Sequence, residues 1–253
     1  MQGTGTQADP YIPTTWDEFV TAIGTSGAYV SLPGGGGQFN MNEIAPEGLA
    51  NSVSVNCAQI DGSGWIIHAP HNIRFYSSYN DCVINDLHFD KIYYTYESAV
   101  FRIYGGKFNR CTFAGEIAGG EYCYLFDEIS ALNKCSIKLS FSGEARSLFY
   151  GSAYKGLTMR SVKAELDYSG CTYTSTEMID TDSDKKINDS LFEIRNCSLN
   201  LNFRGTRSVF HINGSGGYVR NSDGTKKIVT EEQLGSASYL NSVGYPIAAG
   251  GLS

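Results

Sequence analysis

Three acidic residues, Glu116, Asp127 and Glu128, have the right chemistry to act as a general acid and base. Two carboxyl groups about 5–10 Å apart can hydrolyse a glycosidic bond, because one protonates the leaving oxygen while the other activates water or attacks the sugar. In a coiled chain these residues could lie on adjacent turns. Acidic residues at the corners of a coil are also commonly solvated surface groups, and we favour that interpretation over catalysis.

A second acidic cluster is the segment "DTDSD", which contains Asp180, Asp182 and Asp184. Alternate aspartates on a loop could supply three oxygen ligands to Ca²⁺. The segment lacks the glycine and the distal glutamate of a helix-loop-helix calcium site, and two lysines follow it directly. A solvated loop is therefore the favoured interpretation, with Ca²⁺ as the cofactor to test and no other cofactor expected.

Four tyrosines, Tyr93, Tyr94, Tyr96 and Tyr173, are candidates for ligand contact. Tyrosine offers a large amphipathic surface at low entropic cost, which suits sugars and neighbouring subunits. Half-buried packing at corners of the fold is the competing interpretation. The histidines are scattered without zinc-binding spacing, and no G-x-S-x-G turn is present, so neither a zinc site nor a hydrolase triad is predicted.

A repeat in the sequence indicates which elements position these side chains. The phrase "FNRCTF" from Phe108 returns as "LNKCSI" from Leu132, and similar phrases recur along the chain. Fixed-period similarity of this kind predicts a repeat architecture. One set of equivalent positions is Leu87, Cys111, Cys135, Val162 and Cys197, and a second set is Phe101, Phe126, Phe149, Ile179 and Phe210. The spacing grows in the later repeats, so residues 171–190 are predicted to form a loop on the binding side.

Each repeated phrase alternates apolar and polar residues, which is the pattern of a strand with one buried face. The repeats lack helical segments of the length that βαβ crossovers require. We therefore predict an all-β fold, a single right-handed parallel β-helix, in which equivalent residues form inward columns. Thiols stacked about 4.8 Å apart exceed the usual disulfide separation of about 3.5–4.5 Å, so free thiols are expected. Asn109 and Asn133 are expected at corners with left-handed backbone.

Both ends of the chain are predicted to form short helical caps, since an open coil would otherwise expose edge strands. Thr15 and Glu18 form a capping-box pattern, and Thr230 and Gln233 form a second one. The expected organisation is one domain over residues 1–253. It comprises an N-terminal segment and cap over 1–30, coils over 31–222 and a C-terminal cap over 223–253.

Composition and charge exclude several classes of partner. The longest apolar runs are far shorter than the roughly 20 residues that span a bilayer, so no membrane association is predicted. The formal net charge is −7, and the lysines and arginines are scattered along the chain, so nucleic acid is not an expected partner. The N-terminus lacks the features of a secretory signal, which leads us to expect assembly in a host cytoplasm.

The opening "GTGTQADPYIPTTWDEFVTAI" resembles the "GTGTxxDPYxxxTxEE" openings of right-handed parallel β-helix proteins of the pectate-lyase-like superfamily from gut bacteria and their phages. The close, "TEEQLGSASYLNSVGYPI", looks like the C-terminal segment of similar proteins. The resemblance covers both ends and the style of repeat, and it implies the fold. The motifs of the pectin-hydrolysing members are absent, and "RIY" at Arg102 comes nearest to one of them.

We therefore expect a non-catalytic, virion-associated structural or binding protein of a bacteriophage tail or capsid surface. Its expected partners are neighbouring virion subunits or itself, as a homotrimer, together with host glycans. One alternative is a polysaccharide lyase or glycoside hydrolase that acts through the carboxylates named above. Another is a bacterial cell-surface adhesin, which would be located outside the cell.

Overall fold

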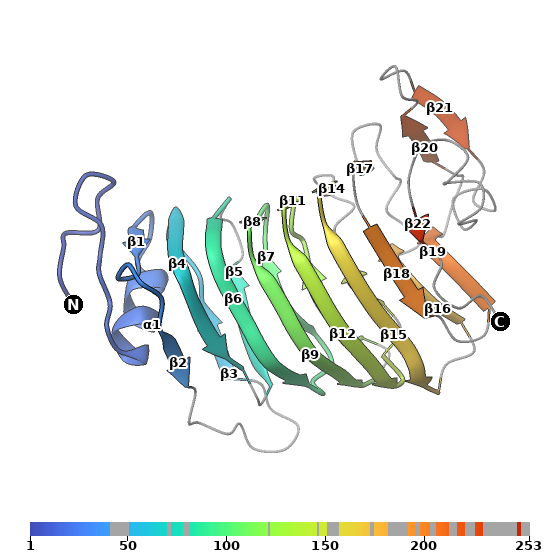
Figure 1. The fold of residues 1–253 in the computed structure, drawn as a ribbon, viewed down its shortest axis with the longest axis horizontal. Coiled ribbons are helices and arrows are strands. Elements are labelled where there is room, and N and C mark those ends of the chain that lie inside the picture. Colours follow the sequence, from blue (N-terminus) through green and yellow to red (C-terminus); the bar gives the residue numbers. More distant parts are fainter. Residues whose placement is uncertain are drawn as a thin grey trace.

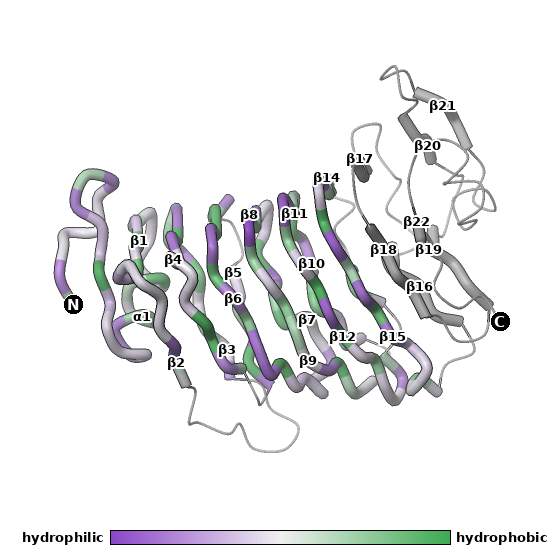
Figure 2. The backbone as a smooth tube through the Cα atoms, in the orientation of Figure 1, coloured by the Kyte–Doolittle hydropathy of each residue, from purple (hydrophilic) through white to green (hydrophobic). Residues whose placement is uncertain are grey.

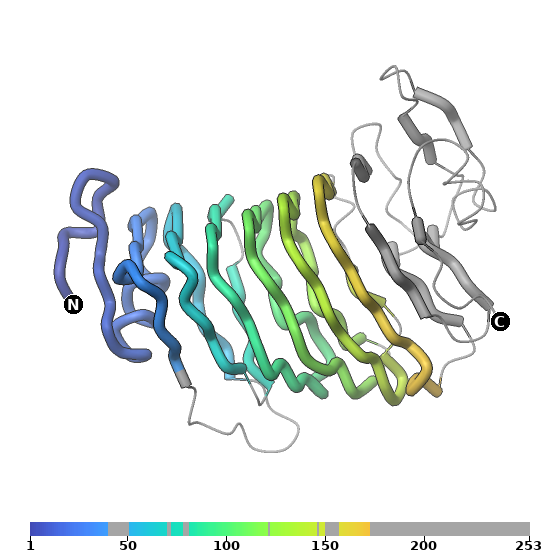
Figure 3. Tube along the Cα trace, viewed as in Figure 1, coloured from blue at the N-terminus to red at the C-terminus, as the bar shows by residue number. Residues whose placement is uncertain are grey.

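The chain forms a parallel β-solenoid, seen side-on in the computed structural model of Figure 1. The structure describes residues 1–40, 51–69, 72–77, 81–120, 122–145, 147–150 and 157–172, and beyond residue 172 it describes the backbone of the strands alone. Successive coils stack in chain order along the long axis, and Figure 3 traces them from the blue N-terminal end to the yellow coil near residue 170. The predicted all-β, parallel coiled fold is confirmed.

Two parallel sheets form the walls of the coil. The larger sheet has 13 described strands. They are β1 (Tyr29–Ser31), β2 (Gln38–Asn40), β4 (Gln59–His68), β6 (Val83–Tyr94), β8 (Lys107–Asn109), β9 (Thr112–Gly119), β11 (Ala131–Asn133), β12 (Ser136–Gly143), β14 (Leu157–Arg160), β15 (Lys163–Cys171), β17 (Phe192–Arg195), β18 (Ser198–Asn202) and β22 (Ile247–Ala248). A regular coil of this sheet contains one short strand, such as β8, followed after a corner by one long strand, such as β9.

The second sheet closes each coil on its other side. Its seven described strands are β3 (Asn51–Ser54), β5 (Ile73–Ser77), β7 (Ala99–Ile103), β10 (Tyr124–Asp127), β13 (Phe149–Tyr150), β16 (Ser175–Thr181) and β19 (Thr206–Ile212). A separate antiparallel pair, β20 (Gly217–Arg220) and β21 (Lys226–Val229), follows the coils in the chain.

The aromatic column predicted from the repeat is confirmed by the register of the second sheet. Phe101 pairs with Phe126, Phe126 with Phe149, Phe149 with Ile179, and Ile179 with Phe210. Phe75 extends the column by one further coil, with its ring stacked 5.2 Å from that of Phe101. Because each fully buried phenylalanine contributes roughly 1.5–3 kcal/mol of transfer free energy, this column is a main source of stability.

The cysteine column is confirmed in the same way. The residues that follow Cys111 and Cys135, Thr112 and Ser136, are paired in register, and the backbone N–H of Ser136 donates to the carbonyl of Cys111 at 3.0 Å. Six cysteines lie in the fully described part of the chain, and all six are buried thiols that form no disulfide. They are Cys57, Cys82, Cys111, Cys123, Cys135 and Cys171. Desolvation is the main reason that the pKa of the Cys123 thiol rises to about 11.

The asparagines at the corners behave differently from the prediction. The left-handed backbone belongs to the residues that follow them, Arg110 with φ of 57° and Lys134 with φ of 53°. The asparagine side chains instead bond to one another across coils: Nδ2 of Asn109 donates to Oδ1 of Asn85 at 2.9 Å, and Nδ2 of Asn133 donates to Oδ1 of Asn109 at 2.8 Å. Identical amides in register can satisfy each other, which explains why asparagine recurs there.

The N-terminal end of the coil is covered by α1 (Trp16–Gly24), as predicted. Thr15 caps the helix by accepting a hydrogen bond from the backbone N–H of Glu18 at 3.3 Å. The carboxylate of Glu18 reaches back to the N–H of Thr14, one residue earlier than a standard capping box. Phe19 is fully buried, and its ring lies 5.2 Å from that of Phe39 in β2.

The predicted C-terminal helix over Thr230–Gln233 and beyond lies outside the described residues. Within the predicted cap region, the structure describes β21, which belongs to the antiparallel pair, and β22, which pairs with β18 at the end of the larger sheet. In the described part of the chain, no helix is long and apolar enough to span a bilayer.

Candidate functional site

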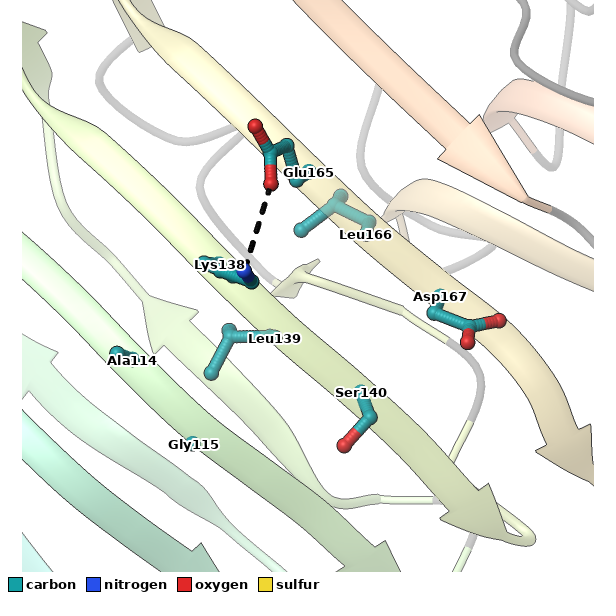
Figure 4. A pocket seen from close by; sticks show the side chains of 8 residues that line it. All are labelled: Ala114, Gly115, Lys138, Leu139, Ser140, Glu165, Leu166 and Asp167. Carbon is teal, nitrogen blue, oxygen red and sulfur yellow. Dashed lines mark ion pairs between the residues drawn. The ribbon is translucent and has the colours of Figure 1, made fainter.

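A shallow groove of about 520 Å³ lies on the outer face of the long strands β9, β12 and β15 (Figure 4). Successive side chains of β12 point to opposite faces of the sheet. Ile137, Leu139 and Phe141 are buried, whereas Lys138 and Ser140 are exposed on the outer face. Figure 2 shows the same alternation as purple and green bands along the strands. The residues that line this β9–β12–β15 groove are Ala114, Gly115, Lys138, Leu139, Ser140, Glu165, Leu166 and Asp167.

Small residues on β9 form one end of the groove. Ala114 pairs with Lys138, and Gly115 pairs with Leu139. Gly115 has a φ of 149°, and a Cβ atom there would lie 2.1 Å from the carbonyl oxygen of Ile92 on β6. The neighbouring strand thus approaches too closely for any side chain, so the position requires glycine and the groove stays open at this end.

The charged groups of the groove form a chain of ion pairs on β12 and β15. Nζ of Lys163 lies 3.0 Å from Oε1 of Glu165, and Nζ of Lys138 lies 3.9 Å from Oε2 of the same carboxylate. The hydrogen bond from Lys163 is the main cause of a lowered pKa for Glu165. Asp167, which pairs in register with Ser140, accepts the backbone N–H of Ser169 at 2.9 Å. The groove thus offers carboxylate acceptors and ammonium donors side by side.

Glu116 lies beside this groove, in register with Ser140 and, on the other side, with Tyr93. Its Oε1 accepts a hydrogen bond from the Ser142 hydroxyl at 2.6 Å. The outward column therefore runs Tyr93, Glu116, Ser140 and Asp167 across four adjacent strands, at about 4.8 Å per strand.

Asp127 and Glu128 come together around Arg102, on the second sheet. Nε of Arg102 lies 3.2 Å from Oδ2 of Asp127 and 3.2 Å from Oε2 of Glu128. The Glu128 hydrogen bond is the main cause of a raised pKa for Arg102. Glu116 belongs to the larger sheet, so the carboxylate pairs considered for catalysis, Glu116 with Asp127 or with Glu128, are divided between two walls of the coil.

The candidate tyrosines have different environments. Tyr93 is 44% exposed, but Tyr94 is only 1% exposed, and its hydroxyl donates to the carbonyl of Ala99 at 3.3 Å. After the register shift between Phe89 and Ile92, Tyr93 faces outward and Tyr94 faces the core, so of these two candidates only Tyr93 presents its ring on the surface. Burial also raises the pKa of Tyr94. Tyr96 is partly buried against the core, and Tyr173 lies outside the described residues.

The acidic segment predicted as a calcium site is only partly described. Asp180 is on β16, in register with Tyr150 of β13 and His211 of β19. Asp182 and Asp184 lie outside the described residues, as does most of the predicted loop over 171–190. In the part of the chain that the structure describes, no cluster of three or more histidine, cysteine, aspartate or glutamate residues could hold a metal ion.

Sequence reasoning missed the groove, although a signal for it was present. Ala114, Lys138 and Glu165 each lie three residues after a member of the cysteine column, Cys111, Cys135 and Val162. Ser140 and Asp167 lie five residues after the last two. Residues at the same distance from the buried column form columns of their own on the outer face, so this spacing predicts which polar side chains share that face.

The chain is thus a parallel β-solenoid with a hollow of mixed apolar and charged lining on one outer face. Comparison with known protein families, with curated proteins and with solved structures finds no match to this chain.

Proposed function

We propose that this protein is a non-catalytic binding and structural protein, carried on a bacteriophage particle, that contacts glycans through the β9–β12–β15 groove. The observation that carries the glycan proposal is the groove itself. It is an open hollow on a stacked sheet, in which Ala114, Leu139 and Leu166 lie beside Ser140, Glu165 and Asp167 as hydrogen-bonding groups. Tyr93 is exposed in the same outward column and offers a ring face for a sugar.

The carboxylate pairs that the sequence suggested for catalysis do not face each other, which favours a non-catalytic role for those residues. Asp127 and Glu128 are engaged by Arg102, and Glu116 lies on the other sheet. Hydrolysis by two carboxylates requires both to flank one bound sugar at about 5–10 Å. The pairs of Glu116 with Asp127 or Glu128 do not share a wall of the coil.

The glycan proposal is tested by screening the purified protein on a glycan array and measuring the affinity of any ligand found by calorimetry. Asp167→Asn removes a charged acceptor and should weaken binding about tenfold or more, as expected for a hydrogen bond to a charged group. Ser140→Trp should abolish binding by filling the groove. The matched control, Asp9→Asn, changes an exposed aspartate in the N-terminal segment and should bind like the wild type.

Two results would overturn this proposal. If Asp167→Asn and Ser140→Trp bind every retained glycan as the wild type does, the groove is not the site. If the bound polysaccharide gains reducing ends or unsaturated products, the protein is an enzyme of this fold instead.

Placement on a phage particle is supported by the resemblance of the N-terminal phrase "GTGTQADPY" and by the stiff stack of coils. An antibody against the protein should decorate purified particles and co-sediment with them in a density gradient. Labelling confined to the surface of bacterial cells would favour the adhesin interpretation.

A further inference from the structure

Five cationic residues that are separated in the sequence lie at or near one corner of the coil: Lys107 begins β8, Arg110 and Lys134 follow β8 and β11, Arg160 ends β14, and Lys163 begins β15. We call this corner the cationic ridge; it faces the upper edge of Figure 1, where β8, β11 and β14 are labelled. All five side chains are exposed.

The register of the sheet brings these residues together. Asn109 pairs with Asn133, and Asn133 pairs with Arg160, so the next residues, Arg110, Lys134 and Ser161, form a column. The backbone N–H of Arg110 donates to the carbonyl of Asn133 at 2.8 Å, and that of Lys134 donates to Arg160 at 2.8 Å. The charges of Arg110 and Lys134 are thus attached one coil apart, at about 4.8 Å.

The members of this column share a left-handed backbone conformation. Arg110 and Lys134 have φ values of 57° and 53°, and Asp86 and Ser161 occupy the equivalent positions with 53° and 54°. In this left-handed region, glycine and asparagine are the residues of lowest strain, and long side chains carry a cost. Lys91 and Glu128 adopt the same backbone, with φ values of 55° and 59°, so this conformation admits long charged side chains, and what distinguishes Arg110 and Lys134 is that their exposed cations lie in one column.

The charge of the ridge is only partly neutralised within the protein. Lys163 pairs with Glu165, and Arg160 has contacts of its own. Among the described residues, Lys107, Arg110 and Lys134 form no ion pair. Arg110 and Lys134 share one column, whose next member is Asp86, and Lys107 lies three residues before Arg110 in the same coil. In a chain with a formal charge of −7, these three cations on two adjacent coils are a local exception.

We propose that the cationic ridge binds a linear polyanion, a polymer that carries phosphate or sulfate groups at regular intervals. Exposed cations on adjacent coils, Lys107, Arg110 and Lys134, can contact successive anionic groups of one strand, and binding is then driven largely by the release of counterions from the polymer. No aromatic side chain is part of the ridge, whereas proteins that hold single-stranded nucleic acid stack its bases on aromatic residues. The ridge adjoins the proposed glycan groove at Lys163, whose Nζ lies 3.0 Å from Oε1 of Glu165, but Lys107, Arg110 and Lys134 do not line that groove.

The test measures the binding of long-chain polyphosphate and of dextran sulfate to the purified protein by fluorescence anisotropy, with neutral dextran as a blank. If three cations of the ridge each contact one anionic group, the affinity should fall about 20-fold between 50 and 200 mM salt. The figure uses the dependence of log affinity on log salt concentration per phosphate contact in single-stranded nucleic acids. Arg110→Asn with Lys134→Asn should weaken binding at least tenfold. Since asparagine tolerates the left-handed backbone, this double variant should keep its thermal stability.

The matched control is Lys91→Asn, because Lys91 is also an exposed lysine with a φ of 55° but lies within the register shift of the long strand β6, between Phe89 and Ile92, and not at the corner that carries the ridge. It should bind both polyanions as the wild type does, and Asp167→Asn in the groove should do the same. A preference for polyphosphate over dextran sulfate, or the reverse, would identify the anionic group.

Three outcomes would overturn the proposal. One is equal affinity of the Arg110→Asn, Lys134→Asn double variant and the wild type. Another is no binding of either polyanion at 50 mM salt. The third is tighter binding of a single-stranded oligonucleotide than of either polymer, which would assign the ridge to nucleic acid.

Discussion

Phe126 illustrates how single residues hold the coil together. It is fully buried, and its ring lies within 6 Å of four other phenylalanine rings: Phe101 at 5.7 Å, Phe108 at 5.6 Å, Phe113 at 4.9 Å and Phe149 at 5.2 Å. These rings come from both sheets and from adjacent coils. One residue therefore couples the two walls of the solenoid, as well as one coil to the next.

Phe126→Ala should lower the free energy of unfolding by about 3–5 kcal/mol, because it removes a large buried side chain and leaves a cavity. Urea denaturation followed by circular dichroism measures the change. Tyr122→Ala, at a side chain that is 50% exposed, is the control and should stay within about 0.5 kcal/mol of the wild type. A loss below about 1 kcal/mol for Phe126→Ala would mean that the column is not the centre of the core.

At the scale of elements, the short and long strands of each coil are joined by a corner whose geometry is repeated. An asparagine ends β8 and β11, a left-handed residue follows, and the buried cysteine comes next. The amide ladder from Asn85 through Asn109 to Asn133 fixes this corner across three coils. Asn109 is the middle member and makes both of the ladder's hydrogen bonds.

Asn109→Ala should destabilise the protein by about 1–3 kcal/mol, because it leaves half-buried amide groups of Asn85 and Asn133 without their ladder partner. Asn85→Ala removes only one of the two bonds and should cost less. Both variants are compared with the wild type by chemical denaturation. If the two variants lose the same amount, the ladder does not act as a connected unit.

The corner also shows how far sequence reasoning reaches at this scale. The repeat and the alternation predicted the strands and their stacking, because both depend on the local order of apolar and polar residues. Which residue adopts the left-handed backbone was predicted one position too early. Asparagine tolerates that conformation, but in register it gains more from bonding to the amides of adjacent coils.

At the scale of the whole molecule, α1 covers the N-terminal end of the stack. The carbonyl of Ile23 near the end of α1 accepts the backbone N–H groups of Asn56 and Cys57, and Phe19 packs on Phe39. Without this cover, the first coil would present unpaired strand edges and apolar side chains, which promote edge-to-edge association.

Removal of residues 1–25 should therefore cause self-association at micromolar concentration, measured by size-exclusion chromatography with light scattering. Phe19→Asp, which loosens the helix without shortening the chain, should shift the protein in the same direction to a smaller extent. A truncated protein of unchanged mass and sharp elution would contradict the capping role.

The sequence by itself determined the coiled fold, the two inward columns, the buried free thiols and the N-terminal cap, since each depends on residue type at a regular spacing. Only the tertiary structure decided which outward residues share a face. In the tertiary structure Glu116 lies on a different sheet from Asp127 and Glu128, and Tyr94 is buried. The β9–β12–β15 groove forms, and Arg110 and Lys134 lie together in the cationic ridge. The physical reason is that neighbours across coils depend on the register of strands two dozen or more residues apart, and one shifted residue exchanges the inner and outer faces.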